Sequence, residues 1–442
     1  MIEFWLDIPF ALRLTILAAV GSVLGAFINW AVDRMNWVVR SRSPWSRIPD
    51  EFWQNYSKKE KKTRISSQKQ WMDYLPVLGW FTYSRYSSVI GPNFWVRPFL
   101  VEVFCTFGLA WLYSLEADQQ IFSLVSYDLA EESVKTVHFR FLCHGTLFFF
   151  LILATLIDFD DYIIPDSITI PGTVIGLFIA SFLPEVQLPV REITEIQVMQ
   201  TGLQLLHRPE AVGLNAASPN PWPELLAPRS GYPAIGIGLG CWWMWCFGMM
   251  NRVWRFHVGW KRGLVLFLRR LRRSPSTWHY LLAGLGGSIL IMIPWFGGVY
   301  WHGTFSGLVG MAFGGGIIWG VRLIGSWLLG REAMGFGDVT FMAMIGAFVG
   351  WQPCLFIFFL APVAGLVLGL IRYIMGGGKE IPYGPFLALA TMIVVLFWKK
   401  FWFQWGEPVF IEPWLVPALI AFCAVMFVLL LGGLRLIKSR FH

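Results

Sequence analysis

Long apolar runs separated by polar segments follow one another along the whole chain. A run of about 20 apolar residues is long enough to cross a bilayer as an α-helix, and the pattern predicts about eleven such crossings. They lie near residues 9–31, 98–115, 141–157, 168–183, 233–250, 280–298, 304–329, 339–350, 353–374, 384–398 and 414–434. The run at 339–350 is short for a full crossing. The sequence therefore predicts an all-α fold, a polytopic membrane helix bundle of about 11 transmembrane helices.

The charges of the polar segments test this assignment independently. Residues 33–97 hold twelve Lys and Arg against five acidic residues, and residues 251–273 hold eight basic residues and no acidic one. Residues 115–141 and 184–232 each hold five acidic residues, against two and three basic ones. Basic segments stay on the cytoplasmic side of a membrane, so the first two segments face inward and the last two outward. With about eleven crossings these assignments alternate without contradiction.

The composition agrees with a membrane protein and excludes other classes. Hydrophobic residues make up 56% of the chain and charged residues only 14%, which lies outside the range of soluble domains. The formal net charge of +8 does not indicate a nucleic-acid partner, because the basic residues lie in segments that flank apolar runs. The six cysteines lie in or beside apolar runs and form no CxxC pair, which is typical of packing residues.

Four aspartates follow the third apolar run, in the stretch LIDFDDYIIPD at residues 156–166. The first of them, Asp158, ends the predicted helix. A second acidic position, Asp338, follows Gly335, Phe336 and Gly337 and opens another apolar run. Four predicted crossings separate Asp158 from Asp338, and an even number returns the chain to the same face. The two carboxyl groups can therefore meet at the cytoplasmic side of the membrane.

Two carboxyl groups held close together share one proton, because both cannot readily ionise. The charged group then takes a proton from a water molecule that attacks a peptide carbonyl, and the protonated group donates to that carbonyl and later to the leaving nitrogen. Gly335 and Gly337 leave the backbone beside Asp338 without bulk and conformationally free. Pro165 removes a backbone donor and ends the polar turn after Asp158. The pattern is typical of a hydrolase that uses two aspartates and no metal.

Other functions fit the same residues. Asp338 and Asp166 can each cap the helix that follows, and Asp160 and Asp161 can simply be hydrated at the membrane interface. Ionisable residues near the hydrocarbon also mark proton pathways. A proton-coupled transporter with Asp158 and Asp338 as its relay is therefore the main alternative, although the symmetric repeat frequent in transporters is not visible in the sequence. A non-catalytic scaffold of a pilus or secretion machine is a third hypothesis.

The motifs around these acids resemble a known family, the type IV prepilin peptidases, which are polytopic membrane aspartic proteases of the GxGD type. The matching residues are Asp158, Pro165, Asp166, Pro171 and Gly172 in the first motif and Glu332, Gly335, Gly337 and Asp338 in the second. Further matches are GAFINWAVDRM (25–35), LPVLGW (75–80), VRPFLVE (96–102) and IPYGPFLA (381–388). A lone GxGD would be weak support, but these matches follow in order over residues 25–388.

This resemblance implies an endopeptidase that cuts the short basic leader from prepilin or pseudopilin precursor proteins. Asp158 and Asp338 would be the catalytic pair, supported by Gly335, Gly337, Pro165, Asp166 and Glu332. Cleavage would take place at the cytoplasmic face of the bacterial inner membrane, which agrees with the topology derived from the loop charges. The expected partners are the precursors and the lipid bilayer, with no nucleic acid, and proteolysis is expected to need no cofactor.

Many family members also methylate the new N-terminus with S-adenosylmethionine, and their first cytoplasmic loop carries two CxxC pairs that bind zinc. The corresponding segments here read SRSPWS (41–46) and YSRYSSVIGPNF (83–94) and hold no cysteine, so zinc is not expected. Glu102 matches a family glutamate linked to methylation and is the candidate residue for cofactor binding. The resemblance leaves open whether S-adenosylmethionine is used.

The resemblance also suggests a division of the chain into six regions. Eight of the predicted helices are family-like and about three are extra. The regions are residues 1–32, the first helix; 33–97, a basic loop that is methyltransferase-like but lacks the zinc cysteines; 98–183, helices with the first aspartate motif; 184–278, an inserted outward loop, an extra helix and a basic cytoplasmic segment; 279–398, helices with the GxGD motif; and 399–442, an extra C-terminal helix.

Overall fold

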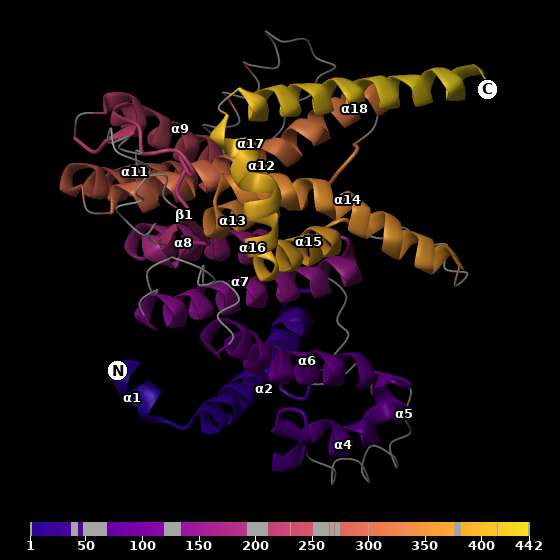
Figure 1. The fold of residues 1–442 in the computed structure, drawn as a ribbon. Coiled ribbons are helices and arrows are strands. Elements are labelled where there is room, and N and C mark those ends of the chain that lie inside the picture. Colours follow the sequence, from indigo (N-terminus) through magenta and orange to yellow (C-terminus); the bar gives the residue numbers. More distant parts are fainter. Residues whose placement is uncertain are drawn as a thin grey trace. The chain divides into compact units, whose positions relative to one another are not determined.

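The computed structural model confirms an all-α architecture (Figure 1). It describes residues 2–36, 43–46, 69–118, 134–191, 211–229, 231–250, 265, 269, 275–298, 300–330, 332–374, 382–412 and 414–440. The chain forms two compact units, the first from residues 1–125, 131–169 and 360–396 and the second from residues 126–130, 170–359 and 397–442. The relative position of the two units is not determined, and each is therefore described by itself.

The first unit is a bundle of long apolar helices. Its helices are α1 (Ile2–Asp7), α2 (Phe10–Met35), α6 (Val96–Tyr113), α7 (Val134–Asp161) and α15 (Gly384–Leu396), with the π-helical turn η4 (Ser114–Asp118) after α6. Helix α2 lies along α6, and α15 packs on α7. The α2–α6 contact is close because Gly25 faces α6, where a Cβ atom would lie 2.7 Å from the Cα atom of Glu102. Small residues allow such close helix packing in membranes.

Four short helical turns precede α6 and form a small structure of their own. They are η2 (Trp71–Tyr74), α4 (Gly79–Tyr83), η3 (Ser84–Tyr86) and α5 (Ser87–Ile90). Their core consists of the buried rings of Trp80, Tyr83 and Tyr86, against which Phe94 and Phe99 pack. Aromatic side chains bury large apolar areas, so even these short elements enclose a core.

The second unit is built around α12 and α13. It contains α9 (Tyr232–Met249), α11 (Pro275–Gly297), α12 (Trp301–Leu329), α13 (Phe336–Val349), α16 (Trp398–Phe401), η8 (Trp402–Gly406), α17 (Glu407–Ile411) and α18 (Leu415–Arg440). Most of helix α8 (Asp166–Phe182) belongs to it, whereas helix α14 (Trp351–Ile374) begins in it and continues from residue 360 in the first unit. The residues of α13 from Asp338 to Val349 are all buried. Such a helix, apolar on every side, belongs in the interior of a bundle.

The acidic segment predicted as an irregular loop at 184–232 contains a small sheet. Strands β1 (Pro189–Arg191) and β2 (Ala211–Gly213) pair antiparallel, with Val190 opposite Val212. The turns η5 (Pro184–Val186) and η6 (Glu224–Leu226) flank them. Residues 192–210 between the strands lie outside the described part of the chain. The alternation in PVR and AVG is too short to distinguish a strand from a loop by pattern alone.

Side chains of α12 and α14 form hydrogen bonds with the backbone of the turn after β2. Trp351 Nε1 donates to the carbonyl oxygen of Ala216 at 2.9 Å, and the Ala216 amide donates to Ser306 Oγ at 2.9 Å. Gln352 Nε2 donates to the carbonyl oxygen of Asn215 at 2.7 Å. Buried polar side chains need such partners, and here the partners are the backbone of this turn.

A described helix occupies each segment predicted to cross the membrane, but fewer than eleven of these helices are long enough to do so alone. Six helices have the length and apolarity of a span, and a seventh results if α15 and the helices after it, bent by 82°, count as one. The 17 residues of α8 and the 14 of α13 reach only about 26 and 21 Å, less than the roughly 30 Å of a hydrocarbon core.

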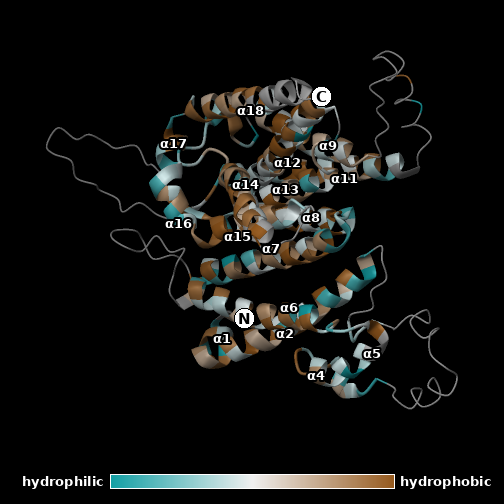
Figure 2. Ribbon diagram, turned by 90° about the vertical axis from the view of Figure 1, so that its right-hand side faces the viewer, coloured by the Kyte–Doolittle hydropathy of each residue, from teal (hydrophilic) through white to brown (hydrophobic). Residues whose placement is uncertain are grey.

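Hydrophobic residues predominate along the helices (Figure 2). Many of their side chains are exposed, and along α11 these include Leu282, Leu285, Ile289, Leu290, Ile293 and Phe296. A lipid environment explains such a surface, because monomeric soluble proteins rarely expose large contiguous apolar patches. Most of the basic segment 251–273 and much of the loop 33–97 lie outside the described residues.

A close contact between α12 and α13 gives a first prediction. A Cβ atom on Gly310 of α12 would collide with the carbonyl oxygen of Gly346 in α13, and would lie 2.8 Å from the Cα atom of Gly350. We expect Gly310→Ala to lower the free energy of unfolding by about 1–3 kcal/mol, because backbone atoms must move apart. The thermal unfolding of the detergent-solubilised protein measures this effect.

Gly316→Ala is the matched control for this prediction. Gly316 lies on the same helix, and a Cβ atom there would have no heavy atom within 4 Å. Alanine is the better helix former, so this variant should unfold at the wild-type temperature or slightly above. Equal unfolding temperatures for the two variants would contradict the close contact of α12 and α13.

Candidate functional site

Asp158 lies in the last turn of α7 and is buried, with 4% of its surface exposed. Tyr162 ends the helix in a left-handed conformation with φ of 57°, and its amide donates to the carbonyl oxygen of Asp158 at 2.9 Å. This geometry is typical of a helix C-terminus. The polar turn then leads through Pro165 into α8, which begins at Asp166. The sequence motif therefore coincides with the end of α7 and the start of α8.

The carboxylate of Asp158 is held by the N-terminus of α15. The Gly384 amide donates to Asp158 Oδ2 at 3.0 Å. A Cβ atom on Gly384 would lie 2.5 Å from Asp158 Oδ2 and 2.8 Å from Ile164 Cδ1, so only glycine allows this approach. Helix N-termini favour negative charge. The segment IPYGPFLA thus supplies the hydrogen-bond donor for the buried aspartate.

A second set of bonds, from Arg97 and Asn36, also holds the end of α7. Arg97, in the first turn of α6, forms an ion pair with Asp160 Oδ1 and also donates to the carbonyl oxygen of Leu156 at 3.0 Å. Asn36 Nδ2 donates to Asp160 Oδ2 at 3.1 Å. The reading of Asp160 as a hydrated interfacial residue is therefore wrong, since its side chain is only 4% exposed. The positions of Arg97 and Asn36 in the sequence, far from Asp160, did not indicate this pairing.

Asp338 lies in the first turn of α13, two residues after its start. Gly335 precedes the helix in an extended conformation, and a Cβ atom there would lie 3.5 Å from Asp338 Oδ2, so the carboxylate turns back toward Gly335. Thr340 Oγ1 donates to the carbonyl oxygen of Gly337 at 3.0 Å. Asp338 is buried, with 9% of its surface exposed. A carboxylate at a helix N-terminus is favourably placed for negative charge.

The supporting residue Glu332 lies outside this arrangement. Its side chain is 82% exposed and pairs with Arg322 Nη2 at 3.1 Å. Arg322 Nε also donates to the carbonyl oxygen of Met334 at 2.9 Å, which fastens the loop before the GxGD motif to α12. Exposed ion pairs contribute little to stability. The bond to Met334 is therefore the more important role of Arg322.

Asp158 belongs to the first unit and Asp338 to the second. The expected meeting of the two carboxyl groups stays a prediction for this reason. Each aspartate by itself has the local setting that a catalytic carboxyl group needs: it is buried, it lies at the end of a helix, and a glycine lies within contact distance of its oxygen atoms.

Glu102 is buried in α6 with both carboxylate oxygens bonded. Asn29 Nδ2 donates to Oε1 at 3.0 Å, and the Val77 amide donates to Oε2 at 2.6 Å. Val77 has a φ of 62°, which is strained for a β-branched residue. Strained backbone persists where its surroundings determine it. Glu102 thus holds the segment before α4 against α2 and α6, a structural role that the sequence did not reveal.

Histidine residues also have partners that the sequence could not indicate. His144 pairs through Nδ1 with Glu116 Oε1 at 2.8 Å, and both side chains are buried. His302 lies against the ring of Trp222, with ring centroids 4.4 Å apart. In the parts of the chain that the structure describes, no three His, Cys, Asp or Glu side chains could hold a metal ion together.

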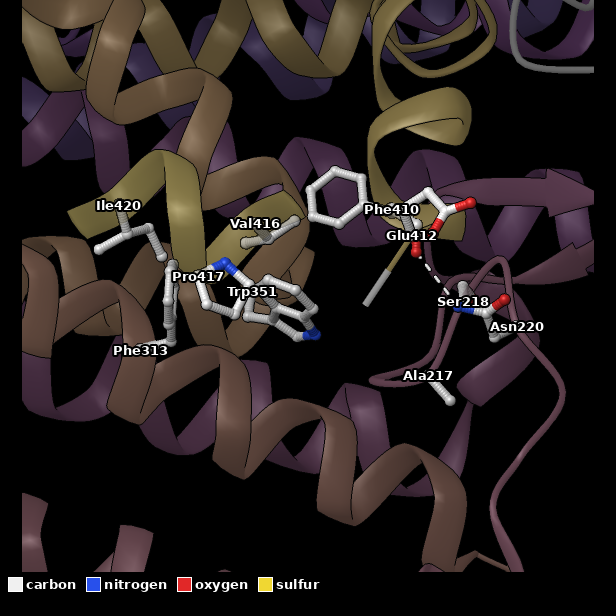
Figure 3. Close-up of a pocket in the computed structure, with 10 residues that line it drawn as sticks. All are labelled: Ala217, Ser218, Asn220, Phe313, Trp351, Phe410, Glu412, Val416, Pro417 and Ile420. Carbon is white, nitrogen blue, oxygen red and sulfur yellow. Dashed lines mark hydrogen bonds between the residues drawn. The ribbon is translucent and has the colours of Figure 1, made fainter. Parts of the chain in front are cut away.

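A pocket of about 440 Å³ lies within the second unit, near the turn after β2 (Figure 3). It is lined by Ala217, Ser218, Asn220, Phe313, Trp351, Phe410, Glu412, Val416, Pro417 and Ile420. Glu412 is the single ionisable residue among them. None of the predicted catalytic residues lines this pocket, and its apolar and aromatic walls contain no pair of acids or nucleophile–base pair.

Comparison with known proteins relates the sequence to one family. Residues 145–205 and 263–370 match the model of the type IV leader peptidase family. The proteins named prepilin leader peptidase/N-methyltransferase from Pseudomonas aeruginosa and Stutzerimonas stutzeri are 30% and 29% identical over 172 residues. These alignments cover 35% of this chain and 54% of each relative. The protein of that name from Xanthomonas campestris is 32% identical over 157 residues, which cover 33% of this chain and 53% of the relative.

The chain thus spans about half the length of the curated relatives that it matches. No solved structure matches it significantly. The two matched stretches of the family model contain Asp158 and Asp338, and the interval between them falls within the segment that the sequence suggested as an insertion. The chain is thus similar to the type IV leader peptidase family over the two stretches that contain its acidic motifs.

Proposed function

We propose that the protein is a membrane aspartic endopeptidase that removes the basic leader from type IV prepilin-like precursors, with Asp158 and Asp338 as its catalytic pair. One observation carries the proposal: the two stretches that match the family model contain these two aspartates, and each is buried at a helix end beside a glycine. Asp161 also lies in a stretch that matches the family model, but it is partly exposed and therefore lacks this combination.

The bond from Gly384 suggests how Asp158 contributes to the reaction. The amide holds Oδ2, which leaves Oδ1 as the oxygen that can accept a proton from water. In a shared-proton pair the partner carboxyl group is protonated and donates to the peptide carbonyl. Water attack gives a tetrahedral intermediate, and return of the proton to the nitrogen breaks the C–N bond. The protons belong to the pair as a unit, so either aspartate can start as the acid.

The proposed location is the cytoplasmic face of the bacterial inner membrane. The basic segments 33–97 and 251–273 support this orientation, because positive charge is retained inside. A basic leader is retained on the same side for the same reason. The similarity to this family favours this function over a proton-coupled transporter or a silent scaffold, since both predicted catalytic motifs are intact and lie in the matched stretches.

Replacement of either aspartate tests the proposal directly. We expect Asp158→Asn and Asp338→Asn each to reduce cleavage of a leader-bearing precursor by at least about a thousandfold, because an amide can neither activate water nor share the proton. Purified protein in detergent and a synthetic precursor segment, followed by mass spectrometry, give the rate. Asp161→Asn removes the same charge three residues from Asp158 and should cleave at close to the wild-type rate. Normal cleavage by either catalytic variant would refute the assignment.

The same assay tests for the N-methyltransferase activity that the names of the relatives include. S-adenosylmethionine is added to the cleavage reaction, and the mass of the mature product is measured. A product with one additional methyl group would extend the proposal to N-methylation of the new N-terminus. An unmodified product, formed at the same rate, would restrict it to proteolysis. Cleavage without the donor separates the two activities.

The close approach of Gly384 to Asp158 gives a further prediction. We expect Gly384→Ala to reduce the cleavage rate at least about tenfold, because the added methyl group must displace the carboxylate that the Gly384 amide holds, and small misplacements of a catalytic group are costly. Gly369→Ala, at a position on α14 where a Cβ atom meets nothing within 4 Å, is the control. If both variants cleave equally fast and fold equally well, the contact does not position Asp158.

A further inference from the structure

Two segments of the first cytoplasmic region are joined through one lysine side chain. Lys69 Nζ donates to the carbonyl oxygens of Pro44, at 2.7 Å, and of Ser46. It also lies 5.3 Å from the ring centroid of Tyr83 and 5.8 Å from that of Tyr74. An ammonium group has three donors and is attracted to aromatic faces. Lys69 therefore contacts the 43–46 turn on one side and the 74–83 aromatic segment on the other.

Each of these two segments is held in place by other bonds as well. The Ser43 amide donates to Asp33 Oδ2 in the last turn of α2, and Trp45 Nε1 donates to the carbonyl oxygen of Tyr74 at 3.0 Å. On the other side, the fully buried Asp73 accepts from Thr82 Oγ1 at 2.7 Å and from Arg85 Nη2 at 2.6 Å. The lysine thus connects two locally ordered pieces, beside the Trp45–Tyr74 hydrogen bond that also joins them.

The 43–46 turn lies within one of the two segments that match the zinc-binding cysteine pairs of the resembled family, 41–46, and Tyr83 begins the other, 83–94. In this chain the segments 41–46 and 83–94 provide serine hydroxyls, backbone carbonyls and tyrosine rings. Zinc sites are built from thiolate, imidazole and carboxylate ligands, and none of the six cysteines lies in either segment. Over the described residues no group of three potential ligands comes together. The residues present do not fit zinc, and a protonated amine lies between the two segments.

We propose that the Lys69 ammonium replaces a structural metal ion in this protein, joining the 43–46 turn to the segment 74–83 that leads into α6. Burial lowers the pKa of Lys69 to about 8, and the charges of Asp73 and Asp33 oppose this shift. Because this pKa still lies above neutral pH, the side chain remains mostly protonated. The cost of desolvating the Lys69 ammonium exceeds its attraction to these two carboxylates. The hydrogen bonds of Lys69 therefore fix the positions of the two segments more than they add to the free energy of folding. The inference does not depend on the proposed peptidase reaction.

Hydrogen exchange of the detergent-solubilised full chain tests this proposal. We expect Lys69→Met to accelerate exchange at the Ser46 amide, and in the peptide covering residues 69–86, by about tenfold or more, because two charged hydrogen bonds are lost. Lys69→Arg retains a cation with several donors and should stay within about threefold of wild type. Lys135→Met removes an exposed lysine of α7 and should change nothing in these peptides.

A metal arm completes the experiment. Treatment of the wild-type protein with EDTA should leave exchange in both segments unchanged, and addition of zinc chloride should not slow exchange in Lys69→Met. Acceleration of wild-type exchange by EDTA, or one zinc ion per chain in the purified protein, would overturn the proposal. So would wild-type exchange in Lys69→Met. If Lys69→Met does not fold, the test uses Lys69→Arg instead. The proposal is supported if Lys69→Arg exchanges at the wild-type rate and EDTA does not change that rate. It is contradicted if EDTA accelerates exchange in Lys69→Arg.

Discussion

A carboxylate that is withdrawn from water must find a hydrogen-bond donor, and this requirement organises the first unit. Asp158 meets it with the Gly384 amide at the N-terminus of α15. The bond is possible only because the two backbones approach to a distance at which a methyl group would touch the carboxylate. The position of α15 on α7, the end of α7 at Tyr162 and the glycine in IPYGPFLA are all required for this single contact. Burial of the acid is thereby combined with a defined orientation of its oxygens.

The same principle recurs at other buried acids of the first unit. Asp160 is neutralised by Arg97, which also caps the carbonyl of Leu156, and Glu102 accepts from Asn29 and from the strained Val77. In each case the donor comes from a different chain segment. The acids therefore determine how segments before and after α6 meet. Their removal would leave buried donors unpaired, which costs more than the bonds themselves contribute.

Apolar periodicity was sufficient to predict the helices, because a run of apolar residues has few alternatives in a membrane. It overestimated how many helices are full spans, since α8 and α13 are apolar but short. Spacing located Asp158 and Asp338 and their glycines. It could not show Arg97, Asn36 or Gly384 beside the α7 acids, because these contacts join residues separated by 59 to 226 positions. The β1–β2 pairing was missed because three-residue strands carry almost no signal.

The manner in which the turn at 215–218 is attached has an evolutionary consequence. Trp351, Gln352 and Ser306 bond to its main-chain carbonyl and amide groups. A main-chain partner is present whatever side chain the residue carries. Ala216 can therefore change in sequence without loosening this attachment, whereas the side chains of Asn215 and Ser218 form hydrogen bonds within the turn. A segment anchored in this way can acquire new surface chemistry while the helices beneath it stay the same.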